Sequence, residues 1–151
     1  MSTEIAIENI LLEQIKAYKI LDQLLKQERE CLIRIDAETV EQLSKEKDTV
    51  LMRLRLLEEE RQRLTSIFVQ DNGIDGEVNL AIISQITGND GLISLRSKLL
   101  SLLQSIDEMN KFNAILIERS INYVKVNTTF LNRFISDKSP RQKGALLSKE
   151  T

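Results

Sequence analysis

A seven-residue spacing of apolar side chains runs through most of this 151-residue chain and limits it to helices that pack side by side. In residues 2–35 the seam positions are spaced 4, 7, 3, 4, 7 and 3 residues apart. They are Ile7, Leu11, Tyr18, Leu21, Leu25, Leu32 and Ile35. A second row repeats every seven residues from Ile10 to Cys31, so the apolar stripe is wider than a two-stranded coiled coil needs. The pattern favours a bundle of three or more helices.

Turn-forming residues are too scarce for an all-β chain. The sequence holds 5 Gly and 1 Pro, and only 4% of its residues are aromatic, so the core must be built from Leu and Ile. Asp36 follows the first apolar segment and precedes two glutamates, which predicts an N-cap and a break between two helices. The alternative is one uninterrupted helix over residues 4–68, about 100 Å long.

The rest of the chain continues the helical pattern in two further segments. A second long helix repeats the spacing from Val40 to Phe68, and four seam positions in the two helices carry polar residues instead: Gln14, Glu28, Lys47 and Arg61. Residues 70–76 form a loop with an Asn-Gly step. We expect a short helix from Glu77 to about Ile86, and a last long helix from Leu92 to about Ile135.

These segments predict an all-α fold, an antiparallel helical bundle or coiled coil of three long helices plus one short helix. Residues 1–135 are expected to form a single helical domain. Residues 136–151 contain the only Pro and carry a net positive charge, so we interpret them as a disordered basic tail.

The composition removes most catalytic chemistry. The chain has no His and a single cysteine, Cys31, which excludes imidazole metal sites, His-dependent triads and an internal disulfide. We interpret Cys31 as a packing residue. A net charge of −2 gives no basic excess for nucleic acid. The N-terminal residues do not have the pattern of a signal peptide, and no stretch is apolar enough to span a membrane, so we expect a cytoplasmic protein without stable membrane insertion. We also expect no cofactor, no metal and no enzymatic activity.

The last helix carries more apolar surface than one packing seam requires. Two adjacent apolar stripes run along it, and only three of the residues from Phe112 to Asn132 are charged. The polar residues between the stripes are amides and hydroxyls. One interpretation is a central helix buried by the other two. The other is a groove that accepts an amphipathic helix from another protein. Both hold if one stripe packs internally and the other receives the partner.

The first half of the chain shows a leucine-rich helix, a turn at Asp36 and a leucine-and-charge helix. The second half has a more specific block with regularly spaced amides, which reads Asn110-x-x-Asn113-x-x-Leu116-Ile117-x-x-Ser120-Ile121. With these two patterns the chain resembles the FlgN family of flagellar type III export chaperones over residues 8–135.

The resemblance implies a cytosolic chaperone that binds the C-terminal amphipathic helix of hook–filament junction proteins, prevents their premature polymerisation and delivers them to the flagellar export gate. By position, it implies a client surface at Asn110, Asn113, Leu116, Ile117, Ser120, Ile121 and Val124. The apolar excess extends this surface to Tyr123, Leu131 and Ile135.

The competing interpretation is a self-associating coiled-coil scaffold whose last helix is buried in an identical partner. The polar residues at four seam positions weaken it, because a long rigid coiled coil fills more of these positions with apolar side chains. We therefore expect a monomer or weak dimer that forms a 1:1 complex with its client.

Overall fold

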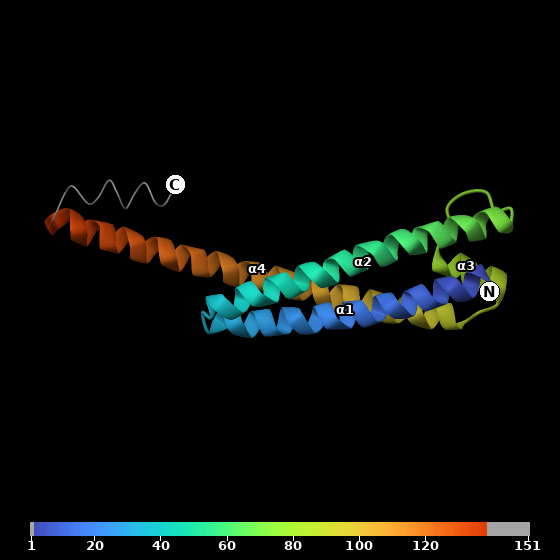
Figure 1. Ribbon diagram of the computed structural model, residues 1–151, viewed down its shortest axis with the longest axis horizontal. Helices are drawn as coiled ribbons and strands as arrows, with labels where there is room; N and C mark the ends of the chain where they lie inside the picture. The colour runs from blue at the N-terminus through green and yellow to red at the C-terminus, as the bar shows by residue number, and fades with distance from the viewer. Residues whose placement is uncertain (1, 139–151) are drawn as a thin grey trace. The chain divides into compact units, whose positions relative to one another are not determined.

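A computed structural model describes residues 2–138 and shows four helices in them (Figure 1). They are α1 (Thr3–Ile33), α2 (Ala37–Asp71), α3 (Leu80–Thr87) and α4 (Gly91–Lys138). Within α4, the side chains of residues 123, 124, 127, 130, 131 and 134–138 are outside the description. The all-α bundle of three long helices and one short helix is thus confirmed. Backbone contacts divide the chain into two units, Met1–Asn113 and Ala114–Thr151, which are described separately.

A sharp turn separates α1 from α2 where the sequence predicts it. Asp36 caps α2: its Oδ1 accepts a hydrogen bond from the Thr39 backbone N–H at 3.1 Å. The hydrogen bonds from Thr39 also hold the pKa of the Asp36 carboxyl below its usual value. The chain reverses through Ile35, whose φ of +58° lies in the left-handed region that normally favours glycine. The turn is therefore made without Gly or Pro, and the single 65-residue helix is wrong.

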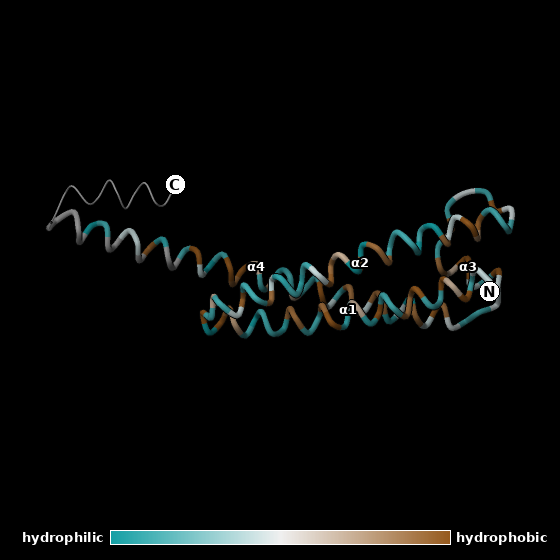
Figure 2. Tube along the Cα trace, viewed as in Figure 1, coloured by the Kyte–Doolittle hydropathy of each residue, from teal (hydrophilic) through white to brown (hydrophobic). Residues whose placement is uncertain are grey.

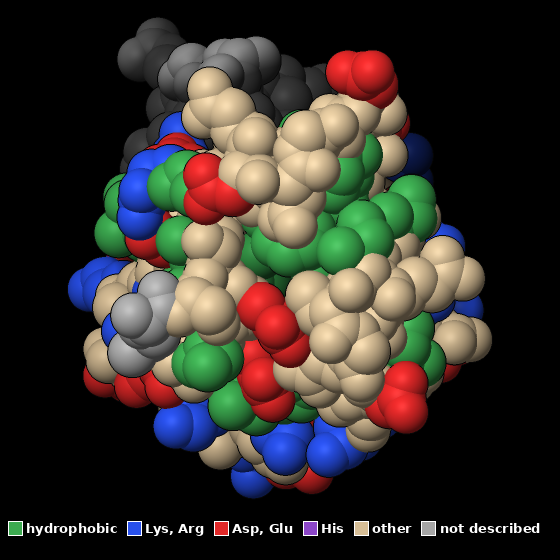
Figure 3. Space-filling view, turned by 90° about the vertical axis from the view of Figure 1, so that its right-hand side faces the viewer, with side chains coloured by type: hydrophobic (Ala, Val, Ile, Leu, Met, Phe, Trp, Pro, Cys, Tyr) green, Lys and Arg blue, Asp and Glu red, His purple; other side chains and the backbone are tan. Residues whose placement is uncertain are grey.

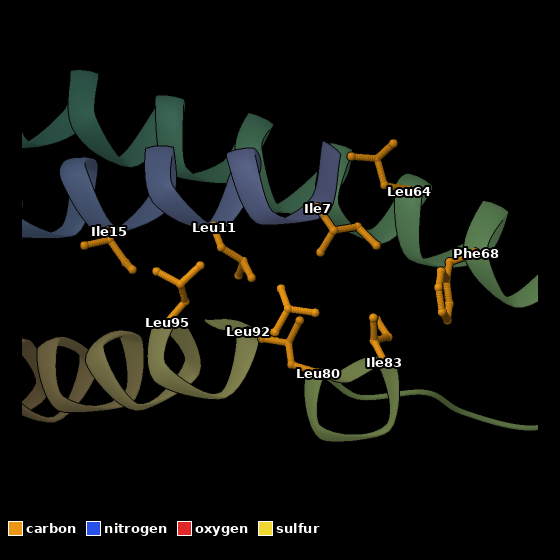
Figure 4. Packing of buried hydrophobic residues seen from close by; sticks show 9 residues of the cluster. All are labelled: Ile7, Leu11, Ile15, Leu64, Phe68, Leu80, Ile83, Leu92 and Leu95. Atoms are coloured by element: carbon orange, nitrogen blue, oxygen red, sulfur yellow. The ribbon is translucent and has the colours of Figure 1, made fainter. Parts of the chain in front are cut away.

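The core of the first unit follows the seam of α1, which packs against α2 on one side and α4 on the other. Near the N-terminus, Ile7 and Leu11 lie in one cluster with Leu92 of α4 (Figure 4). Further along, Leu21 lies in a second cluster with Leu54 of α2 and Ile106 of α4. Since both α1 and α4 advance in the same direction, these two helices run parallel and α2 runs antiparallel to them. Hydrophobic and hydrophilic residues alternate along each helix accordingly (Figure 2).

The short helix α3 fills one end of the first unit. Its Leu80 and Ile83 are buried among Leu64 and Phe68 of α2 and the first turns of α4 (Figure 4). It begins three residues later than expected, because Asn79 is its N-cap and accepts a hydrogen bond from the Ile82 N–H at 3.0 Å. Seen from this end, hydrophobic side chains gather centrally among charged ones (Figure 3).

The described part of the second unit is one helical segment, residues 114–138 of α4. It continues three residues past the expected end at Ile135. Residues 139–151, most of the expected tail, lie outside the described residues, so the disorder of this tail and the single-domain boundary stay predictions.

Candidate functional site

The client surface expected from the sequence lies on α4. Asn110 is exposed, and Ile117 and Ile121 keep 40% and 50% of their surface open to solvent. Ile117 and Ile121, both in the second unit, are four residues apart, so they share one face of the helix. Leu116 and Ser120 are half-buried, and the Ser120 hydroxyl donates a hydrogen bond to the Leu116 carbonyl at 2.9 Å.

Four of the expected residues lie on α4 without a description of their side chains. The side chains of Tyr123, Val124, Leu131 and Ile135 lie outside the described residues. Their role in a client surface therefore stays a prediction from the sequence.

The second unit also exposes apolar residues that the sequence pattern did not single out. Ile115 is 48% exposed and Val126 is 67% exposed, on a different face from Ile117 and Ile121. Within residues 114–138 no second element exists to cover them, because this part of the unit is a single helix. A helix that is apolar on several faces is ordinarily covered by other protein or lipid. The sequence pattern missed Ile115 and Val126 because they lie outside the two heptad rows of this helix. Counting apolar residues on every face of the helix would have included them.

Asn113 has a different environment from its expected partners on the surface. Its side chain is 2% exposed, and its Nδ2 donates to the Leu25 carbonyl and to Glu28 Oε1, both at 2.9 Å. Glu28 Oε2 in turn binds Lys47 Nζ at 2.6 Å. This inner polar layer, Glu28, Lys47 and Asn113, joins α1, α2 and α4. Asn113 thus anchors α4 on α1; its place on a client surface stays a prediction.

A second polar layer forms where Gln14 and Arg61 replace apolar seam residues. Gln14 Nε2 donates to Glu58 Oε2 at 2.9 Å, and Arg61 Nε donates to the same oxygen at 2.9 Å. The hydrogen bond from Arg61 holds the pKa of Glu58 below its ordinary value, and Glu58 raises the pKa of Arg61. Both groups remain charged at neutral pH, so this layer sets register without titrating there.

Neither a metal site nor a membrane-spanning helix is found in the part of the chain that the structure describes. Within residues 2–138, no group of three or more Cys, Asp or Glu side chains is placed to hold a metal ion. In the same range, no helix is long and apolar enough to cross a membrane. Cys31 is buried beside Leu24 and Leu43, which agrees with a packing role.

A comparison with protein-family models gives a match to the FlgN protein family over residues 1–140. The chain belongs to the FlgN family. The family comprises flagellar export chaperones, which are binding proteins and not enzymes, so this FlgN-family chain functions in flagellum assembly as a chaperone of export substrates. Searches of curated proteins and of solved structures found no match.

Proposed function

We propose that this chain binds the C-terminal amphipathic helix of flagellar hook–filament junction proteins on the second unit's part of α4. Leu116, Ile117 and Ile121 form this surface, whereas Ile115 and Val126 lie on another face of the helix and stay outside it. While bound there, the client helix is unavailable for polymerisation, and the chaperone carries it in the cytoplasm to the flagellar export gate.

The observation that supports this most strongly is the open apolar helix. Ile115, Ile117, Ile121 and Val126 are each 40% exposed or more, and their unit contains no other described element to cover them. An amphipathic helix laid along α4 would place its apolar residues at the same three- and four-residue spacing. Burial of such surface supplies the driving force for association.

The energetics suit a complex that must later come apart. Full burial of an isoleucine side chain is worth about 1.5–3 kcal/mol, and about half of Ile117 and Ile121 is still exposed. Each therefore contributes about 1 kcal/mol from its own side. Ordering of side chains and loss of motion on association offset a large part of the total. Release then follows from competition or handover at the export gate.

Isothermal titration with a peptide of the last ~40 residues of a junction protein, a length that holds an amphipathic helix of several turns, tests the proposal. We expect saturable 1:1 binding with a negative heat-capacity change. Ile121→Asp should weaken binding at least about tenfold, since it places a charge in an apolar contact. Ile20→Asp on α1 is the matched control, because Ile20 is 52% exposed and Ile121 50%. Equal loss in both variants, or in neither, would contradict the proposed surface.

The same open helix also supports the second candidate, self-association as a coiled-coil scaffold. An identical copy offers the same apolar faces, and a two-fold arrangement would cover both at once. Sedimentation velocity without a client separates the two candidates. A chaperone is a monomer or weak dimer that becomes a 1:1 heterodimer, whereas a scaffold is a stable oligomer before any client is added.

A further inference from the structure

A hollow of about 400 Å³ lies in the first unit beside the N-terminal end of α3. Its sides come from all three long helices: Gln14 and Tyr18 on α1, Arg61 on α2, and Leu99 and Leu103 on α4. The first residues of α3 complete its lining. Every described residue of the hollow belongs to the first unit, so it is separate from the surface proposed for the client.

The length of α3 explains why the hollow exists. At the level of Ile7 and Leu11, Leu80 and Ile83 of α3 fill the space between α2 and α4. Two to three turns further along α1, at Ala17 and Leu21, the long helices close directly on one another. The eight residues of α3 span only about 12 Å, which is too short to reach that closure. The stretch between remains open.

Gln14, one of the residues that line this hollow, has a buried hydrogen-bond acceptor without a partner among the described residues. Gln14 is 1% exposed, and its Nε2 donates to Glu58. Because a carboxylate only accepts hydrogen bonds, this contact fixes the orientation of the amide and leaves Oε1 on the other side. Within the described residues Oε1 has no donor. A buried acceptor of this kind gains a full hydrogen bond when a ligand brings an N–H or O–H group. Because Oε1 itself is buried, the atoms around it must move to admit the donor.

The charges of the hollow favour an acidic ligand. Glu58 and Arg61 neutralise each other, but Arg96 is exposed, and among the described side chains no carboxylate pairs with it. Burial raises the pKa of Tyr18, so its hydroxyl is protonated and can donate to an anion. One unmatched positive charge and one hydroxyl donor therefore face an incoming ligand.

The size of the open region points to a peptide. A second hollow of about 790 Å³ shares Arg61 and Val78 with the first and continues along α2 as far as Gln70. Its lining includes Glu77, so the end of the trough that favours an acidic group is the one at Arg96. On the other side, Leu100 and Leu103 are 49% and 37% exposed and extend the apolar wall. The trough spans three helices, which is longer than a small metabolite needs and suits several residues of extended chain.

We propose that this trough is a docking site for a short peptide segment of a partner protein. The segment places an apolar side chain on Leu100 and Leu103, a carboxylate near Arg96, and a backbone or side-chain donor on Gln14 Oε1. It is a second recognition site, independent of the client surface on residues 116–121.

Two-dimensional ¹H–¹⁵N NMR of the full chain tests this site, because the Gln14 side-chain amide gives its own signal. The probes are the blocked peptides acetyl-Leu-Asp-Leu-amide and acetyl-Leu-Lys-Leu-amide. We expect the acidic peptide to shift the Gln14 amide and the backbone signals of residues 96–103 saturably, and to bind about tenfold more tightly than the basic one.

Arg96→Gln should remove this preference, whereas Arg55→Gln on the outer face of α2 should keep it, since the Arg55 side chain is 71% exposed. Ile121→Asp should also leave the titration unchanged, which separates this site from the proposed client surface. A Gln14 signal that does not respond to either peptide at millimolar concentration shows a hollow that holds water alone and overturns the proposal. Equal shifts with both peptides overturn it as well.

Discussion

Lys47→Met is expected to destabilise the bundle strongly although Lys47 lies near the surface. Its Nζ is 2.6 Å from Glu28 Oε2, and the Glu28 side chain is only 4% exposed. The substitution therefore leaves a buried carboxylate without its cation. Asn113 still donates to Glu28 Oε1, and this contact is the only compensation recorded on the described residues.

The magnitude follows from the burial of each partner. Removing one member of a fully buried ion pair costs about 3–5 kcal/mol. Because the Lys47 side chain is 22% exposed and Asn113 remains as a donor, we expect a loss of about 2–3 kcal/mol. The double variant Glu28→Leu/Lys47→Met makes both seam positions apolar, so its free energy of unfolding should lie within about 1 kcal/mol of the unmodified protein. The Glu28→Leu single variant completes the double-mutant cycle from which the coupling energy of the pair is measured.

Urea unfolding followed by far-UV circular dichroism measures these values, provided that the slope with denaturant is unchanged. Lys45→Met is the control, because Lys45 is exposed and two residues away on α2; it should shift the free energy by less than about 0.5 kcal/mol. Equal effects of the two lysine substitutions would refute the inner polar layer as a determinant of bundle stability.

Three further changes follow from the same contacts. Ile35→Gly should stabilise the chain by about 0.5–1 kcal/mol in thermal unfolding. The reason is that Ile35 has a left-handed φ of +58°, a conformation that costs a residue with a side chain about 1–2 kcal/mol and that glycine adopts freely. Unchanged or lower stability would count against strain at this turn. Ile83→Ala in α3 should cost about 2–4 kcal/mol in urea unfolding, since Ile83 is 1% exposed; a loss below 1 kcal/mol would mean that α3 is not part of the core. The hydrogen bond from Arg61 lowers the pKa of Glu58 in the fold, so the stabilisation is present above the ordinary value of 4.5 and is lost as pH falls through the folded pKa. The difference in unfolding free energy between the unmodified chain and Arg61→Gln should therefore shrink as the pH is lowered below 4.5, and a difference independent of pH would contradict this.

The seam spacing alone predicted the helices, because side chains that recur every three and four residues must share a face. It also marked Gln14, Glu28, Lys47 and Arg61 as polar residues at seam positions, and the structure places all four in the two polar layers, which the sequence did not predict. Asp36 predicted the turn because an aspartate followed by helix-forming residues is a strong N-cap. These features depend on contacts within one helix or on a strict repeat, and a sequence displays both.

The role of Asn113 depended on information that the repeat does not contain. An amide in a leucine-rich helix is compatible with a partner surface and with a buried anchor, and only the register of α4 against α1 places it beside Leu25 and Glu28. The start of α3 differs from the expected Glu77 for a related reason: Asn79 caps the helix through its hydrogen bond from the Ile82 N–H, so the first helical residue is Leu80. Ile115 and Val126 were not predicted as exposed apolar residues because they lie outside both heptad rows of the last helix.

Site-specific photocrosslinking tests the central claim most directly. A photoreactive phenylalanine derivative is placed at position 121 on α4 or at position 20 on α1, which carry isoleucines of nearly equal exposure. Each protein is illuminated with and without a hook–filament junction protein. The account predicts a crosslink to the C-terminal segment of the junction protein from position 121 and not from position 20. Crosslinks from position 121 only to a second copy of the chain, or equal client crosslinks from both positions, would contradict it.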